Sequence, residues 1–240
     1  MALGGVGAVL PDDVEAVLLD GLGTLVGLEP PGPALAAQLR ETHGVELASG
    51  DAERAFRAEI AYYRAHHHEG RDAEALEDLR RRCAEVLREG LPTAVGEALS
   101  TPQLTAAMLV ALRFTAYPDA LAALERLRAR GIALIVVSNW DISLPAVLRG
   151  VDLEGMVDGV VTSAQVGRPK PEQAIFDAGL ALAGAAPGRT VHVGDSVEHD
   201  VRGALAAGIR PVLLRRGEAE PEEAPRGVPV ISSLAELLSA

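Results

Sequence analysis

The sequence of 240 residues is poor in several residue types, and each shortage excludes a class of protein. Its single cysteine, Cys83, can form neither an intramolecular disulfide nor a cysteine-only metal site, and it fits a reducing compartment. Basic residues number 22 against 34 acidic ones, and the net charge of −12 disfavours nucleic acid and anionic membranes. No apolar run reaches the roughly 18–20 residues of a membrane-spanning helix. We expect a cytoplasmic protein, monomeric or homodimeric, whose partner is a small molecule.

Short apolar runs alternate with amphipathic stretches over most of the chain. This alternation is typical of an α/β fold with a parallel sheet, because each parallel strand needs a crossover that is usually helical. The predicted strands cover residues 14–19, 132–137, 157–162, 190–193, 211–214 and 228–231. The predicted helices between them cover residues 118–130, 143–149, 171–183, 198–207 and 234–239.

Residues 31–113 interrupt this alternation. They contain no convincing strand and are rich in Ala, Leu, Glu and Arg, so we expect an inserted helical unit. Its helices are predicted at residues 33–43, 50–68, 72–89 and 101–113. Residues 1–30 and 114–240 then form the sheet domain, with 30–33 as a stiff proline-rich linker. We expect residues 215–226 to form an exposed loop without catalytic interest.

Polar residues follow four of the predicted strands. Ligands of open parallel sheets bind at the carboxyl ends of the strands, so these residues are the candidates for chemistry. They are Asp20 with Gly21 and Thr24 after the first strand, Ser138 and Asn139 after the second, Lys170 after the third, and Asp195 and Asp200 after the fourth.

In this order, and with a helical insertion after the first strand, the segments resemble the haloacid dehalogenase-like hydrolase superfamily. The resemblance implies a Rossmann-like core with helices on both faces of the sheet, and a helical cap over residues 31–113. It implies that Asp20 is a nucleophile that forms an aspartyl intermediate, which water hydrolyses. The simpler interpretation of Asp20 by itself is a cap of the following turn.

The resemblance also assigns roles to the other strand-end residues. Ser138 and Asn139 would bind substrate oxygens, although Ser138 is equally suited to cap the next helix. Lys170 would hold the nucleophile and the transferred group as a point charge. Gly21 would bring backbone close to the ligand, and Thr24 would contact the loop or the nucleophile.

A Mg²⁺ site is the remaining implication. Asp20 and Asp195 would supply hard oxygen ligands together with the backbone carbonyl of Leu22. Asp200 would hold a metal-bound water or orient Lys170. Its alternative is an acid in the first turn of a helix, favoured by the helix dipole.

Leu22 departs from the family pattern, which has a second aspartate there in its phosphatases. That aspartate protonates the leaving alcohol and activates water, work worth about 10²–10⁴-fold in rate. Three explanations stay open: an atypical phosphatase of a small phosphorylated metabolite, a 2-haloacid dehalogenase, or a vestigial protein that binds a phosphorylated ligand. Relatives that cleave phosphonates also lack this aspartate and form a Schiff base between the substrate and a lysine of the cap. That chemistry is excluded here because residues 31–113 contain no lysine. His192, within a strand, is expected to be packed and hydrogen-bonded.

Overall fold

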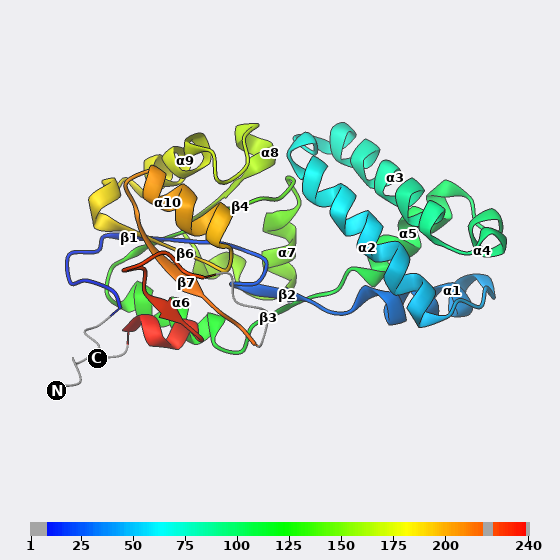
Figure 1. Ribbon diagram of the computed structural model, residues 1–240, viewed down its shortest axis with the longest axis horizontal. Helices are drawn as coiled ribbons and strands as arrows, with labels where there is room; N and C mark the ends of the chain where they lie inside the picture. The colour runs from blue at the N-terminus through cyan, green and yellow to red at the C-terminus, as the bar shows by residue number, and fades with distance from the viewer. Residues whose placement is uncertain (1–8, 218–222, 239–240) are drawn as a thin grey trace. The chain divides into compact units, whose positions relative to one another are not determined.

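The computed structural model describes residues 9–217 and 223–238. One part of it is a six-stranded parallel sheet in the order β5-β4-β1-β6-β7-β8 (Figure 1). The strands are β1 (Ala16–Leu19), β4 (Ala133–Ser138), β5 (Gly159–Thr162), β6 (Thr190–Gly194), β7 (Arg210–Leu214) and β8 (Val230–Ile231). Each lies within two residues of a predicted strand, which confirms the α/β prediction.

Helices flank both faces of this sheet (Figure 1). Helix α9 packs on β4 and β5 through Ile175, Phe176 and Leu180, and α6 packs on β4 from the other side. The elements are α6 (Ala120–Ala129), α7 (Leu144–Gly150), α8 (Ser163–Val166), α9 (Gln173–Ala183) and α10 (Gly203–Ala206). A π-helix, η4 (Val197–Arg202), precedes α10, and short 3₁₀ turns are η2 (Glu154–Met156), η3 (Pro187–Arg189) and η5 (Leu234–Leu238).

A second compact unit spans Leu28–Thr115 and is helical. It contains α1 (Pro31–His43), α2 (Ser49–His66), η1 (His67–Glu69), α3 (Ala73–Gly90), α4 (Thr93–Glu97) and α5 (Thr101–Ala111). It has its own apolar core, in which Phe56, Leu79, Leu104 and Met108 are almost fully buried. Burial of that core, rather than helix propensity, supplies most of the stability of these helices. The four predicted helices are present, and α4 was not predicted.

The segments that join the two units differ from the prediction. Strands β2 (Val26–Leu28) and β3 (Phe114–Ala116) form a two-stranded sheet that we did not predict. The predicted linker at residues 30–33 is largely the first turn of α1, which begins at Pro31. Proline fits there because the first helical N–H has no partner within the helix.

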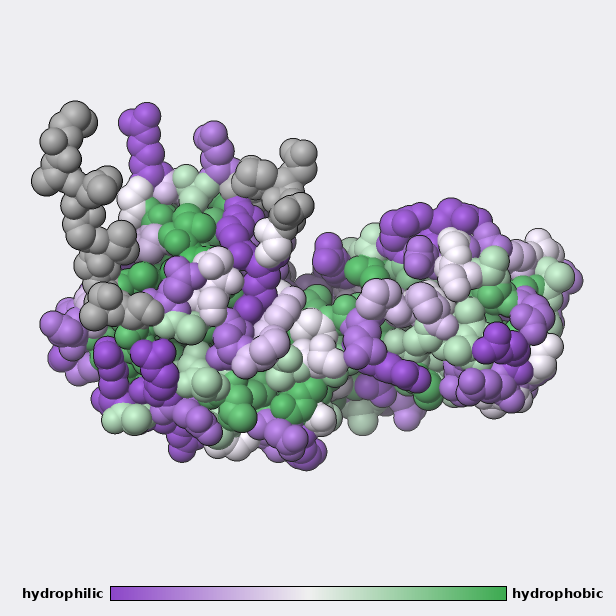
Figure 2. Space-filling view, turned by 90° about the horizontal axis from the view of Figure 1, so that it is seen from below, coloured by the Kyte–Doolittle hydropathy of each residue, from purple (hydrophilic) through white to green (hydrophobic). Residues whose placement is uncertain are grey.

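The surface of both units mixes residue types. Hydrophilic side chains alternate with small apolar areas on the face drawn in Figure 2. Among the large apolar residues that are exposed in the described ranges, Leu121 lies on α6, Leu182 on α9 and Leu205 on α10, and Leu109 and Val110 are neighbours on α5. Exposed apolar residues of this kind are ordinary in globular proteins. None of the helices in residues 9–217 and 223–238 has the length and apolarity needed to cross a bilayer.

Candidate active site

Asp20 lies at the carboxyl end of β1, which is placed between β4 and β6 in the sheet. Its backbone N–H donates to the carbonyl of Val193 at 2.9 Å, which fixes it to the end of β6. The chain then turns tightly, because the carbonyl of Gly21 accepts from the N–H groups of Leu25 and Val26. The Asp20 side chain is only 6% exposed. The predicted nucleophile is therefore buried at the point where three strand ends meet.

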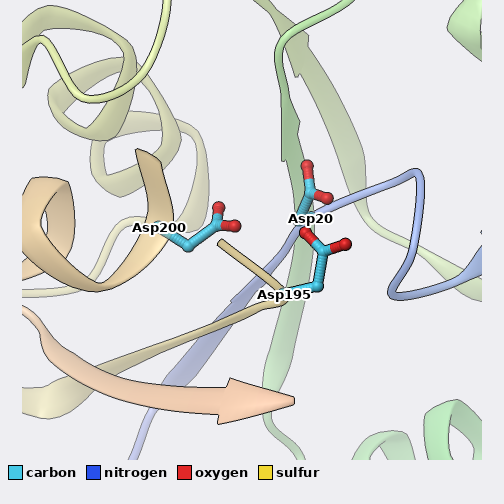
Figure 3. A group of neighbouring side chains, drawn as sticks. All are labelled: Asp20, Asp195 and Asp200. Atoms are coloured by element: carbon cyan, nitrogen blue, oxygen red, sulfur yellow. The ribbon is translucent and has the colours of Figure 1, made fainter. Parts of the chain in front are cut away.

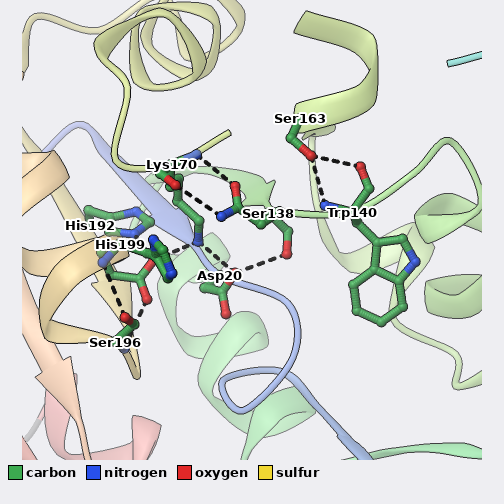
Figure 4. A network of polar contacts seen from close by, with 10 residues as sticks. Asp20, Ser138, Trp140, Ser163, Lys170, His192, Ser196 and His199 are labelled. Carbon is green, nitrogen blue, oxygen red and sulfur yellow. Dashed lines mark hydrogen bonds and ion pairs between the residues drawn. The ribbon is translucent and has the colours of Figure 1, made fainter. Parts of the chain in front are cut away.

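Lys170 links two of the predicted carboxylates. Its ammonium nitrogen lies 2.6 Å from Oδ1 of Asp20 (Figure 4). The same nitrogen lies 2.5 Å from Oδ1 of Asp200. It is the only lysine of the chain and is 3% exposed. A buried ammonium is strongly destabilising unless it is paired, so the two carboxylates are its compensation. Their charges outweigh the opposing effect of burial and raise the pKa of Lys170, so it is charged at any ordinary pH.

Ser138 contacts the candidate nucleophile directly. Its hydroxyl donates to Oδ1 of Asp20 at 2.9 Å, the same oxygen that Lys170 contacts. A side chain on Gly21 would press on this hydroxyl, because an added Cβ would lie 3.1 Å from Ser138 Oγ. The absence of a side chain at Gly21 therefore allows the turn to pass close to Ser138. The alternative role of Ser138 as a helix cap has no support, since α7 begins six residues later, after Ser143.

Asn139 makes two contacts that we did not predict. Its side-chain amide donates to the carbonyl of Lys170 at 3.1 Å and accepts from the N–H of Lys170 at 2.7 Å. Both ends of the amide are thus engaged with the backbone of one residue. Asn139 therefore fixes the loop that presents Lys170. The binding of substrate oxygens by its side chain or its backbone N–H stays a prediction.

Thr24 is fully buried, and its hydroxyl finds no hydrogen-bond partner among the described residues. Its carbonyl accepts from Arg216 at 2.9 Å. This placement does not favour the predicted contact of the Thr24 hydroxyl with the nucleophile. The useful group of Thr24 is its backbone, which ties the turn after Asp20 to a distant part of the chain.

Asp195 completes a group of three carboxylates with Asp20 and Asp200. One oxygen of each lies within 4.8 Å of the others, and the three side chains point toward a common region (Figure 3). Two glycines make this approach possible. A Cβ on Gly23 would collide with the Asp195 carboxylate, and one on Gly194 would collide with that of Asp200. Gly23 also has φ +84°, a conformation that costs other residues more than glycine.

Desolvation raises two pKa values at the site, and the charges of neighbouring carboxylates add to it. Burial and the charges of Asp20 and Asp200 raise the pKa of Asp195 to about 7, against the opposing influence of Lys170. Burial and the Asp200 charge likewise raise the pKa of Asp20, and Lys170 again opposes them. One ammonium does not balance three carboxylates, and the remaining negative charge favours a bound cation.

Asp200 is held by three donors. Oδ1 accepts from Lys170 and from Nε2 of His192 at 2.8 Å, and Oδ2 accepts from the N–H of Ser196 at 3.0 Å. Burial opposes ionisation of Asp200, but Lys170 and His192 outweigh it and lower its pKa. Of the two roles predicted for Asp200, this geometry favours the orientation of Lys170.

Sequence reasoning missed two supports of the site. His192 was expected to be packed and hydrogen-bonded, but not to be bonded to Asp200. Ser163 was not predicted at all: its hydroxyl donates to the carbonyl of Trp140 at 3.0 Å and accepts from the N–H of Trp140 at 3.1 Å. Ser163 thus fixes the chain just beyond Ser138. The signal for Ser163 was its place directly after a predicted strand, the same position that marks Ser138.

The donor set fits a hard divalent cation such as Mg²⁺. Carboxylate oxygens are its preferred protein ligands, and three of them converge here with uncompensated negative charge. Asp20 and Asp195 are the better ligands, since the oxygens of Asp200 already accept three hydrogen bonds. The predicted ligand role of the Leu22 carbonyl stays a prediction.

Fold and site together define an α/β protein whose carboxylates and single lysine meet at the carboxyl ends of parallel strands. The family model of haloacid dehalogenase-like hydrolases matches residues 14–208, and the chain belongs to this family. Haloacid dehalogenase-like hydrolase domain-containing protein 3 of Bos taurus is 40% identical over 122 residues, which cover 50% of this chain and 49% of that protein. Phosphoserine phosphatase of Thermus thermophilus is 35% identical over 147 residues, 58% of either chain. The chain thus spans about half the length of the curated relatives it matches.

Solved structures share the whole fold. A haloacid dehalogenase-type (HAD) phosphatase from Thermococcus onnurineus is 26% identical with a TM-score of 0.64, over 93% of this chain and 96% of that one. The L-2-haloacid dehalogenase of Xanthobacter autotrophicus has a TM-score of 0.65 at 19% identity, over 93% and 96% of the two chains. At that identity the second likeness concerns the fold alone. It leaves the choice between phosphatase and dehalogenase to the site.

Proposed function

We propose that the protein is a Mg²⁺-dependent phosphatase of a small phosphorylated metabolite, acting through a phosphoryl group carried on Asp20. The observation that carries this proposal is the convergence of the Asp20, Asp195 and Asp200 carboxylates around one region with Lys170 beside them. Relatives named as phosphatases of phosphoserine, ribulose-1,5-bisphosphate and glyceraldehyde 3-phosphate support the substrate class.

The reaction has two steps. In the first, a carboxylate oxygen of Asp20 attacks phosphorus and the bond between phosphorus and the leaving oxygen breaks. Ser138 and Lys170 both contact Oδ1, so Oδ2 is the attacking oxygen in this proposal. In the second step, water attacks phosphorus, the aspartyl–phosphate bond breaks, and inorganic phosphate and the free carboxylate result. Lys170 stabilises negative charge on the phosphoryl group in both steps.

A bound Mg²⁺, held by Asp20 and Asp195, would neutralise charge on the phosphoryl oxygens and orient them. The unusual feature of the site is the source of the proton for the leaving group. Leu22 has no proton to give to a leaving alkoxide, so the first step favours a leaving group that is stable as an anion, such as the carboxylate of an acyl phosphate. We propose that residues 31–113 act as the cap that selects the substrate.

A dehalogenase is the second candidate, and Leu22 is the observation that favours it. Halide leaves without a proton, so the missing acid would cost that reaction nothing. The same Asp20 oxygen would attack carbon, and water would hydrolyse the resulting ester. Such a reaction has no need for Asp195 beside Asp20, and for this reason we place it second.

The test is a panel of assays on the purified protein. Phosphomonoesters, acyl phosphates and 2-haloacids are supplied as substrates, each with Mg²⁺ and with a chelator. We expect phosphate release that requires Mg²⁺, is greatest for acyl phosphates, and is lost in Asp20→Asn. Asp177→Asn, an exposed aspartate on α9, is the matched control and keeps full activity. Leu22→Asp restores an acid and raises the rate on phosphomonoesters about tenfold or more.

The other outcomes identify the alternatives. Release of halide without metal establishes the dehalogenase and contradicts the proposal. Tight binding of Mg²⁺ with no turnover of any substrate, also in Leu22→Asp, establishes a vestigial binding protein.

A further inference from the structure

Arg216 lies in the segment that we predicted to be an exposed loop without catalytic interest, but Arg216 itself is largely buried. Its side chain is only 16% exposed. The guanidinium forms a bidentate pair with Asp119, at 2.8 and 3.1 Å, and its carbon lies 3.9 Å from the ring centre of Tyr117. A paired and stacked arginine is a fixed structural element rather than a solvated surface charge. Residues 218–222 of the same predicted loop lie outside the described residues.

Arg216 also holds the turn that carries Asp20. One of its terminal nitrogens donates to the carbonyl of Thr24 at 2.9 Å while contacting Asp119. Thr24 lies four residues after the nucleophile, within the turn that is closed by bonds to the Gly21 carbonyl. The far end of this turn is fixed as well, because the N–H of Tyr117 donates to the carbonyl of Leu25 at 3.0 Å.

Asp119 anchors the arrangement to the C-terminal part of the chain. Its carboxylate accepts from the hydroxyl of Ser233 at 2.6 Å and from the N–H of Leu234 at 2.8 Å, besides the two bonds from Arg216. The turn after Asp20, the chain returning at residue 116 and the C-terminal turn η5 are thus joined through one ion pair. These three segments are far apart in sequence.

The position of this turn matters for the chemistry at the site. It contains Leu22, whose carbonyl is a predicted metal ligand, and Gly23, which lies so close to the Asp195 carboxylate that a Cβ would collide with it. A displacement of the turn therefore changes both the direction of Asp20 and the space left for Asp195. Small displacements of reacting groups lower rates strongly, by about 10²-fold for 1 Å.

We propose that Arg216, held by Asp119 and Tyr117, is a positioning residue that fixes the turn following Asp20 in the geometry required for nucleophilic attack. It touches no reacting atom and acts through the Thr24 carbonyl. Arginine suits this task because its planar fork serves a carboxylate and a carbonyl at once while its face stacks on an aromatic ring. A lysine has no such fork.

The first arm of the test needs no substrate. Amide hydrogen exchange is measured on the full chain and on Arg216→Met, which retains an unbranched apolar side chain but loses every donor. We expect the amides of Leu25 and Val26, which donate to Gly21, to exchange at least about tenfold faster, while amides of α9 change little. Unchanged exchange at Leu25 and Val26, or an equal increase throughout the sheet domain, overturns the proposal.

Arg126→Met is the matched control. Arg126 also holds the C-terminal turn, by donating to the carbonyls of Ala235 and Leu238, and within the described ranges it makes no hydrogen bond to residues 20–26. This variant is expected to loosen η5 and to leave the exchange of Leu25 and Val26 unchanged. If Arg126→Met accelerates Leu25 and Val26 as much as Arg216→Met does, the contact with Thr24 has no special role and the proposal fails.

The second arm rests on the proposed function and uses whichever phosphate ester the enzyme hydrolyses. We expect Arg216→Met to lower kcat at least tenfold with KM within about twofold, and Arg216→Lys to recover part of that loss. Equal kcat values in wild type and Arg216→Met, with a rise in KM alone, contradict the positioning role. If the wild type is inactive on every ester, the exchange arm alone decides, so failure of the proposed function is distinguishable. If Arg216→Met does not fold, Arg216→Lys is subjected to the same exchange criterion.

Discussion

The sheet domain and the helical unit bury ionisable groups in opposite ways. In the sheet domain, Asp20, Lys170 and Asp200 share short bonds, and each buried charge meets one of opposite sign. In the helical unit, Glu59 of α2 is 3% exposed, and the partner identified for its carboxyl is the thiol of Cys83. Burial raises the pKa of Glu59 to about 7, with the Cys83 bond opposing it. The sheet domain therefore pairs its buried Lys170 and Asp200 with opposite charges, whereas in the helical unit burial favours the protonated form of Glu59 below about pH 7.

This difference distinguishes a candidate functional site from an ionisable side chain that is buried within the packing of helices. Paired buried charges are seldom more stable than apolar groups of the same shape, and they are expected where chemistry needs them. A protonated acid in a helix interface tolerates burial because its charge is absent. The comparison can be tested by removing one member at a time, in order of the effect expected.

Lys170→Met gives the largest effect on stability. It leaves Asp20 and Asp200 buried without their shared cation, so we expect the free energy of unfolding to fall by about 3–5 kcal/mol. Urea denaturation measures the loss. Arg189→Met, which breaks an exposed pair with Glu15, is the control and is expected to change stability by less than about 1 kcal/mol. A loss for Lys170→Met no larger than for this control contradicts the account of the buried pair.

Glu59→Gln gives an effect that depends on pH. Below pH 4.5 Glu59 is protonated in both the folded and the unfolded chain, so it contributes nothing to the pH dependence. Between pH 4.5 and about 7 the unfolded chain releases the proton and the folded chain retains it. The free energy of unfolding of the wild type therefore falls as pH rises through this range, by up to about 3 kcal/mol.

Glutamine has no proton to lose, so Glu59→Gln escapes this penalty. We expect the variant to gain stability over the wild type progressively from pH 4.5 to 7 and to keep that gain at pH 8. Glu77→Gln, an exposed residue of α3, serves as the control and shows no such trend. A constant difference between Glu59→Gln and wild type at all pH values argues that the carboxyl is ionised in the folded protein.

His192→Leu gives the smallest effect. It removes the donor to Asp200 but also removes Nδ1, which is buried without a partner among the described residues. These changes oppose one another, so we expect a net loss of about 1–2 kcal/mol. His192→Gln keeps an N–H donor of similar reach and should lose less. If the two variants are equally stable, the bond between His192 and Asp200 contributes nothing measurable.

Features that depend on neighbours in sequence could be predicted, whereas features that depend on partners far along the chain could not. Apolar runs placed β1 and β4 within two residues, because a buried strand is a local pattern. Strands β2 and β3 have three residues each, and no pattern of that length distinguishes them from connecting chain. The positions of Asp20, Lys170 and Asp195 followed from their places after predicted strands.

Contacts between residues that lie far apart along the chain were not predicted. Asn139 was placed correctly at a strand end, but its partner is the backbone of Lys170, 31 positions later. Arg216 lies in a segment whose glutamates are typical of an exposed loop, and its partner Asp119 is 97 positions earlier. The composition of a segment reflects only its neighbours along the chain, whereas the roles of Asn139 and Arg216 depend on residues that are close in space.

The central claim is that Asp20 takes up the phosphoryl group, and a trapping experiment tests it most directly. The protein is mixed with Mg²⁺ and a labelled acyl phosphate, quenched in acid within milliseconds, digested and examined by mass spectrometry. We predict label on the peptide that contains Asp20, and no label in Asp20→Asn or in the presence of a chelator. Label on any other residue, or turnover of the acyl phosphate that persists in Asp20→Asn, would contradict the account.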